Sequence, residues 1–105
     1  MNETVLTQQV KRKLNITWED TDTDNRVSDI MGQAKSAMLR KLGIADTSFD
    51  FSVSSEENRL YLAYCLYLYN HCENEFDDNY RNDILQVREF HEVKQYMEAV
   101  ENESK

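Results

Sequence analysis

Apolar residues recur every three or four positions along two stretches of the first half of the chain, and this spacing predicts two amphipathic helices. The first helix runs from Thr4 to Leu14, and its basic residues fall in the last turn, where the helix dipole favours cations. The second runs from Asp24 to Leu42, and Gly43 follows it as the expected C′ residue. This second helix has the most regular pattern in the chain, with apolar residues at Val27, Ile30, Met31, Ala34, Ala37, Met38 and Leu42.

The residues just before this helix are acids and helix-capping types. We expect Thr21 or Asp22 to be the N-cap, and we expect Trp18 to fold over the first turn as a hydrophobic staple. Gly32 lies inside the helix, where glycine costs about 1 kcal/mol relative to alanine. We therefore expect a neighbouring helix to approach closely at Gly32, because small alanines follow it.

The alternation of Asp20, Asp22 and Asp24 is also typical of a calcium-binding EF-hand loop. Asn25 stands where that loop needs glycine, and Met31 stands where it needs a bidentate glutamate. These two positions argue against a calcium site.

The stretch from Ser54 to Cys72 predicts the central helix of the fold. From Leu60 to Tyr69 every residue is aliphatic, aromatic, alanine or cysteine, so the helix must be covered on most sides. The apolar run is too short to span a membrane, which needs about 20 such residues. Ser54 and Glu57 have the spacing of a capping box at its start.

The segment Ile44–Val53 breaks the helical period and predicts a loop with at most a short extended segment. Phe49 and Phe51 alternate there with polar residues. Two alternatives remain for them: they pack beneath the central helix, or they contact a partner subunit.

After the central helix, the acid-rich segment Glu73–Asp83 predicts a change of direction, with Asn74 or Asp78 as the cap of a new helix. This last helix is long enough to reach past the core, and it then offers Tyr96, Met97 and Val100 to a partner. Its apolar positions form one predicted stripe: Phe76, Tyr80, Ile84, Val87, Phe90, Val93, Met97 and Val100.

Together these elements predict an all-α fold, a small bundle of about four helices with a buried central Tyr/Leu-rich helix and a long C-terminal helix. We expect one domain over residues 1–100 and a polar, flexible tail over residues 101–105. The chain has no proline and only 2 glycines, which disfavours the many turns of an all-β fold.

The formal net charge of −8 disfavours ordinary nucleic-acid binding, because phosphates require a basic surface. Cys65 and Cys72 would lie two turns apart on one helix, too far for a disulfide, so we expect reduced thiols. The N-terminus has no apolar signal region. These features predict an intracellular, soluble protein without a membrane segment.

No catalytic motif is present: nucleophilic serine motifs, glycine-rich phosphate loops and paired CxxC motifs are all missing. His71 and Glu75 have the spacing for two metal ligands on one helix, and His91 is a possible third. A polar helix end with an ion pair is the commoner arrangement. We expect no enzyme activity and no metal or other cofactor.

The order of these features resembles the head-tail connector proteins of long-tailed phages and prophages, also called head-completion or DNA-packaging adaptors. The similarity covers nearly the whole chain, from Val5 to about Met97. Four segments carry it: LNITWEDTDTDNRVSDIMGQAKSAMLRKLGI from Leu14, FDFS from Phe49, LYLAYCLYLYNHCENEFDDNYRNDILQVR from Leu60, and HEVKQYMEA from His91. Each segment alone is unspecific, and their order and spacing make the resemblance.

The resemblance implies a structural protein whose copies form a ring under the portal of a filled capsid, expected to match the twelvefold portal. Such a ring extends the DNA channel and docks later head-tail joining proteins. Double-stranded DNA would pass without sequence-specific binding. The protein would assemble in the host cytoplasm and remain at the head-tail interface of the virion. The alternative is an acidic regulatory module, an inhibitor or DNA mimic, that binds one protein.

A ring interface is heterologous, so different faces of each copy must complement each other. We expect the acidic segment after the central helix to pair with basic residues of the second helix on the next subunit. The expected subunit or portal contacts are Lys35, Arg40, Lys41, Phe49, Phe51, Glu73, Glu75, Asp77, Asp78, Tyr96, Met97 and Val100.

Overall fold

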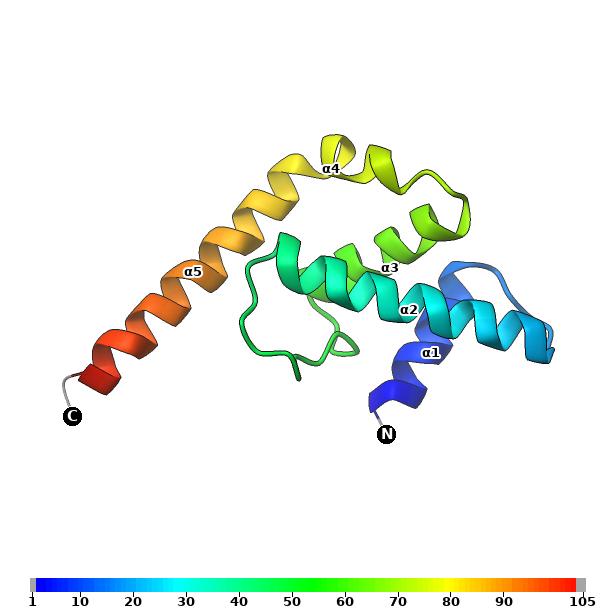
Figure 1. The fold of residues 1–105 in the computed structure, drawn as a ribbon, viewed down its shortest axis with the longest axis horizontal. Helices are drawn as coiled ribbons and strands as arrows, with labels where there is room; N and C mark the ends of the chain where they lie inside the picture. Colours follow the sequence, from blue (N-terminus) through cyan, green and yellow to red (C-terminus); the bar gives the residue numbers. More distant parts are fainter. Residues whose placement is uncertain (1, 104–105) are drawn as a thin grey trace.

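The computed structural model describes residues 2–103, and over this range it contains helices and their connections and no strand (Figure 1). The predicted all-α fold is confirmed. Three helices come first: α1 (Asn2–Lys13), α2 (Thr21–Lys41) and α3 (Glu56–Tyr69). A 3-10 turn, η1 (Glu73–Glu75), and a short helix, α4 (Phe76–Asn79), then lead into the long α5 (Arg81–Glu103).

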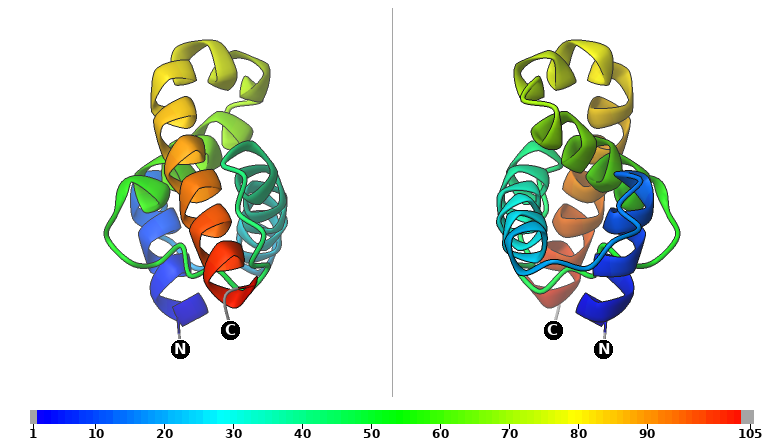
Figure 2. Two further views of the ribbon diagram at one scale, coloured as in Figure 1. Left: turned by 90° about the vertical axis from the view of Figure 1, so that its left-hand side faces the viewer. Right: turned by 90° about the vertical axis from the view of Figure 1, so that its right-hand side faces the viewer.

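The prediction of a covered central helix is confirmed for α3, which contacts α1, α2 and α5. Seen end-on, α1 and α2 lie on either side of the molecule (Figure 2). No residue from Leu60 to Tyr69 is exposed, and Leu60 itself is completely buried. Tyr61 stacks on Phe51, with ring centroids 5.0 Å apart, and its hydroxyl donates to the Met31 carbonyl. Aromatic packing and one buried hydrogen bond therefore join α3 to α2 and to the loop before it.

The capping box predicted at Ser54 is wrong. Ser55 is the N-cap of α3, and its hydroxyl oxygen accepts a hydrogen bond from the Asn58 amide at 3.2 Å. Because Ser54 and Ser55 are adjacent, the sequence offers two starting points for the helix. Glu57 does not reach back to the cap, and its carboxylate bonds to His91 instead.

The buried face of α2 confirms the predicted pattern, but the helix begins earlier than expected, with Asp20 as its N-cap. The predicted caps, Thr21 and Asp22, are already helical. Trp18 lies over the first turn as expected, and its indole nitrogen donates to the Thr23 hydroxyl at 3.0 Å. The indole remains half-exposed, so this contact is a hydrogen bond rather than an apolar staple.

Three helices end in the same way, on a residue with left-handed backbone: Asn15 (φ 60°), Gly43 (φ 65°) and His71 (φ 58°). In each case the amide of the following residue donates back to a carbonyl in the last helical turn at 2.9 Å. This is the Schellman arrangement, and it confirms Gly43 as the C′ residue of α2. His71 takes the same role in a conformation that favours glycine.

Gly32 has no close neighbour. A Cβ added at this position would meet no atom within 4 Å, so the expected close approach of a second helix is wrong. The small residues that do pack tightly are Ala34 and Ala37, both of which are buried. Gly32 instead lines an open groove beside α2.

The loop between α2 and α3 is irregular, as predicted, and two Asx turns shape it. Asp46 accepts hydrogen bonds from the Ser48 hydroxyl and amide, and Asp50 does the same with Ser52. These hydrogen bonds hold the pKa of both carboxyls below their usual value. Phe51 is buried in the core and Phe49 is half-buried, so the core alternative is confirmed for Phe51.

The predicted continuous stripe from Phe76 to Val100 is wrong, because the chain turns at Tyr80 between α4 and α5. Phe76 is buried, and Tyr67 and Tyr80 pack against its ring. α5 then runs obliquely away from α4, and its C-terminal half extends past the other helices (Figure 1). It continues through Glu103, into the segment where we expected a flexible tail, and residues 104–105 lie outside the described part.

The projecting helix makes the molecule elongated. The Cα extents are 53 × 32 × 19 Å, and the radius of gyration is 15.2 Å. A compact chain of this length has a radius of gyration of about 13 Å.

Candidate functional site

The inner face of α5 attaches the helix to the rest of the chain through polar contacts. His91 lies 2.8 Å from Glu57 of α3, with only 6% and 15% of the two side chains exposed. An ionised carboxylate can only accept hydrogen bonds, so we assign the ring N–H of His91 as the donor to Glu57. The Gln95 amide donates to the Gly43 carbonyl at 3.1 Å and its oxygen accepts from the Ala45 amide at 2.9 Å. These contacts, together with buried Val87, fix which side of α5 faces inward.

The opposite side of α5 carries large apolar residues exposed to solvent. We call them the outer stripe, with the exposed fraction of each residue in parentheses: Phe90 (60%), Val93 (56%), Tyr96 (68%), Met97 (59%) and Val100 (40%). At 100° per residue, they centre roughly 160° around the helix from the inner face. Such a contiguous exposed apolar set is a candidate interaction surface, whereas single exposed apolar residues are common on any protein.

The outer stripe has the spacing of a helix seam. Phe90, Val93, Met97 and Val100 alternate three and four residues apart, which is the a/d spacing of a helix that packs along a partner. Acidic residues flank it, Glu89 and Glu101 among them. The surface is therefore apolar along its centre and mainly negative along its edges.

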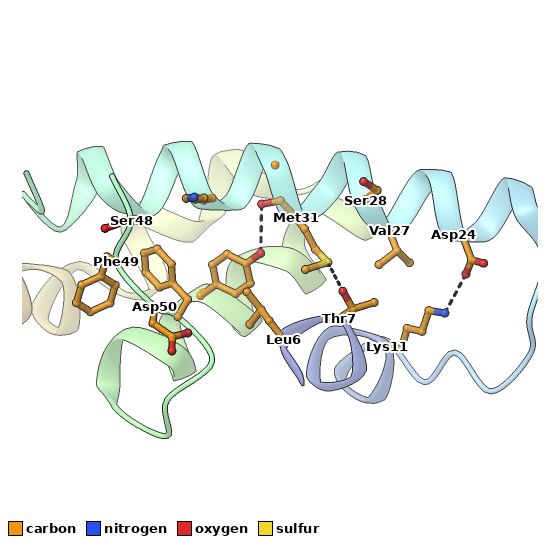
Figure 3. A pocket seen from close by; sticks show the side chains of 14 residues that line it. Leu6, Thr7, Lys11, Asp24, Val27, Ser28, Met31, Ser48, Phe49 and Asp50 are labelled. Carbon is orange, nitrogen blue, oxygen red and sulfur yellow. Dashed lines mark hydrogen bonds and ion pairs between the residues drawn. The ribbon is translucent and has the colours of Figure 1, made fainter. Parts of the chain in front are cut away.

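A groove of about 630 Å³ lies between α1, α2 and the loop before α3 (Figure 3). Thr7 and Lys11 of α1 face the groove from below. Thr7 contacts Met31 of α2 across it, and Lys11 forms an ion pair of 2.9 Å with Asp24 of α2. Gly32 leaves space on the α2 wall. The apolar lining of the groove consists of Leu6, Val27, Met31, Phe49, Phe51 and Tyr61.

The expected interface residues fall in three places. Lys35, Phe49 and Phe51 come together on the groove. Another group lies on the outer stripe: Tyr96, Met97 and Val100. The acids are all exposed along η1 and α4: Glu73, Glu75, Asp77 and Asp78.

One expected intersubunit pairing occurs within the chain. Lys41 binds both carboxylate oxygens of Asp77, at 2.7 and 2.9 Å. Lys41 and Asp77 are therefore already paired within one chain, and the expected pairing of Lys41 with acids of another copy stays a prediction. Arg40 is exposed, and it makes no ion pair with any residue in the described range.

Two parts of these surfaces were not predicted as sites. Phe90 and Val93 were expected in the helix stripe but not at an interface. The heptad spacing from Phe90 to Val100 was the available signal. Gly32 was expected at a tight helix contact, although a glycine within a helix is equally compatible with an open wall.

The remaining reactive side chains offer little chemistry. Cys65 and Cys72 are free thiols, and burial raises the pKa of Cys65 to about 12. α3 ends before His71, so His71 and Glu75 do not share one helix as the metal alternative required. Within residues 2–103, no three histidine, cysteine or acidic side chains are grouped to hold a metal ion. No helix in this range has the length and apolarity needed to cross a membrane.

Comparison with models of protein families, with curated proteins and with solved structures found no match.

Proposed function

We propose that this chain is a structural assembly subunit, a head-tail connector that forms a ring under a phage portal. The outer stripe of α5 is the observation that supports this function best. It presents five large apolar residues on the side turned away from the chain's own core. A connector subunit needs a surface of this kind, and it needs no catalytic group.

The charge of the chain agrees with this proposal. A net charge of −8 gives a surface that repels phosphates, so DNA in the channel would pass without adhering. The exposed acids of η1 and α4 would contribute to such a wall. The proposed partners are further copies of the chain, the portal protein and a later head-tail joining protein.

The test is the absolute mass of the purified chain, alone and mixed with the portal protein encoded in the same element, by light scattering behind a sizing column. We expect a ring-sized species, or comigration with the portal at about one copy per portal subunit. Val93→Gln/Met97→Gln should abolish this association. Glu98→Gln, which changes the same helix away from the stripe, should not.

A second function, the acidic regulatory module, is favoured by the exposed acids that follow α3. Glu73 and Glu75 make no ion pair with any residue in the described range. A chain that stays at 12.5 kDa and does not bind the portal would contradict the connector and favour this module. A charge-reversing substitution at Glu73 and Glu75 would then abolish binding to its single partner.

A further inference from the structure

We propose that the groove beside α2 receives the outer stripe of α5 from a second copy of the chain. The inference rests on the proposed function, because it names the contact through which copies would join. Three features of the chain support it: the lining of the groove, the orientation of α5 and the distribution of charge.

The groove suits apolar side chains that project from a helix. Met31, Phe49 and Phe51 provide apolar lining, and the missing Cβ of Gly32 leaves the α2 wall open. A volume of about 630 Å³ holds several side chains but not a whole helix, whose diameter is about 10–12 Å. The fit is therefore of a row of side chains pressed into the groove from outside, as knobs enter holes.

The chain's own α5 cannot supply these side chains. The contacts of His91 and Gln95 hold its inner face against α3 and the end of α2. The outer stripe lies on the opposite side of the same straight helix. Phe49 at the groove already contacts the inner face, with its ring centroid 5.6 Å from that of His91. The occupant must therefore come from another molecule.

Charge favours the groove over a second α5 as the partner of the stripe. The groove is lined by two lysines and two acids, so its charges balance: Lys11 pairs with Asp24, and Lys35 and Asp50 make no ion pair with any residue in the described range. The stripe is flanked by Glu89 and Glu101. Two α5 helices packed along their stripes would bring several glutamates together, and between Val93 and Val100 the sequence offers Lys94 alone to offset them. A stripe in the groove meets a lining of balanced charge instead, in which Lys35 can offset its glutamates.

This contact joins two different surfaces, so it is heterologous. After pairing, one copy keeps an unoccupied stripe and the other an unoccupied groove, so a further copy can add at either end of the pair. Such head-to-tail contacts give closed rings when the rotation between copies closes, and open filaments otherwise.

The experiment uses two variants with complementary defects. Gly32→Trp fills the groove and leaves the stripe intact, whereas Val93→Gln/Met97→Gln removes the stripe and leaves the groove intact. Gly32→Ala is the matched control for the first, because it adds one methyl group and leaves the groove open. Glu98→Gln is the control for the second. Circular dichroism checks that every variant is helical.

Sedimentation equilibrium is run on each protein up to about 1 mM, a range that detects even weak contacts. We expect the wild-type chain and both controls to self-associate and each defective variant to stay at 12.5 kDa. An equimolar mixture of the two defective variants should give a species of twice that mass and no larger, because one intact interface remains.

Lys35→Glu is a second groove variant that does not endanger folding, because the side chain is exposed. We expect it to weaken self-association by roughly threefold. An unchanged association constant would contradict the predicted approach of the glutamates.

Three results would overturn the inference. The first is self-association of Gly32→Trp, which would indicate pairing of two α5 helices. The second is a mixture that stays at the mass of one chain, and the third is a wild-type chain that is monomeric throughout. Binding to the portal ring is measured separately, so a chain that binds the portal but fails here loses only the groove contact.

Discussion

α3 and α5 differ in a way that their sequences do not make obvious. Both carry large apolar residues on more than one side. From Leu60 to Tyr69 of α3 no residue is exposed, whereas Phe90, Val93 and Met97 of α5 are each more than half exposed. α3 lies among α1, α2 and α5, while the C-terminal half of α5 extends beyond them. The difference shows that the position of an apolar helix in the bundle decides whether its large side chains are buried in the core or exposed to solvent.

Truncating one apolar residue on each helix is the strongest test of this difference in burial. Leu60→Ala should lower the free energy of unfolding by about 2–5 kcal/mol, because it leaves a cavity in a fully buried site. Val93→Ala should change it by less than about 0.5 kcal/mol. Urea unfolding followed by circular dichroism measures both. Equal losses in the two variants would mean that the outer stripe is buried in the isolated chain.

The contact that joins the two helices is the next largest effect. Glu57→Ala should cost about 1–3 kcal/mol, because it leaves the buried His91 ring without its partner. The control is Glu56→Ala, which removes an exposed ion pair with Arg59 and should cost less than about 1 kcal/mol. The same unfolding assay compares them, and a Glu57 variant as stable as the Glu56 variant would contradict this assignment.

The coverage of α3 also predicts a dependence on alkaline pH. Burial raises the pKa of Cys65 to about 12 from an ordinary value of 9.0, so the unfolded chain releases this proton first. Stability should therefore fall as pH rises above 9.0, by about 1.4 kcal/mol by pH 10. Cys65→Ala should lack this part of the loss. Unfolding curves at pH 8 and pH 10 for the two proteins give the difference, and parallel losses would contradict a covered thiol.

A smaller effect is expected where α3 ends. His71→Gly should raise the free energy of unfolding by about 1 kcal/mol, because glycine adopts the left-handed backbone without steric cost. Asn15→Gly is the matched control, and its gain should be smaller because asparagine tolerates this conformation. Thermal unfolding ranks the two, and an equal or larger gain at Asn15 would show that His71 is not strained.

The smallest effect on stability is expected on the outer stripe itself. Met97→Gln should change the free energy of unfolding by less than about 0.5 kcal/mol, because the side chain is already exposed. Its effect should appear in association instead, as a loss of mass in light scattering at high concentration. A large loss of stability without a loss of association would reverse the roles assigned to the two helices.

The sequence predicts the helices well and their contacts less well, for physical reasons. The spacing of Val27, Ile30 and Met31 identifies the buried face of α2, because burial on one side leaves a 3.6-residue period. The same criterion fails on α5. A helix with apolar residues on two sides has no single face for the period to select. The predicted stripe therefore joined Val87, which is buried, to Phe90, which is exposed.

The candidate site was predicted only in part. Tyr96 and Met97 were expected beyond the core because helix length alone predicts the overhang. The groove was not predicted, because it depends on how α1 crosses α2, and that crossing is set by contacts between distant residues. The pairing of Lys41 with Asp77 and that of Glu57 with His91 were not predicted for the same reason, because the sequence shows charges but not the distances between them.

The elongated shape of the chain has a consequence for how its assembly must be measured. A molecule with extents of 53 × 32 × 19 Å experiences more friction than a sphere of equal mass, so it diffuses more slowly and elutes early from a sizing column. A sizing column calibrated with globular standards would therefore give a single chain the apparent mass of a small oligomer. Scattering and sedimentation equilibrium report mass independently of drag, which makes them the suitable measures for counting copies of this protein.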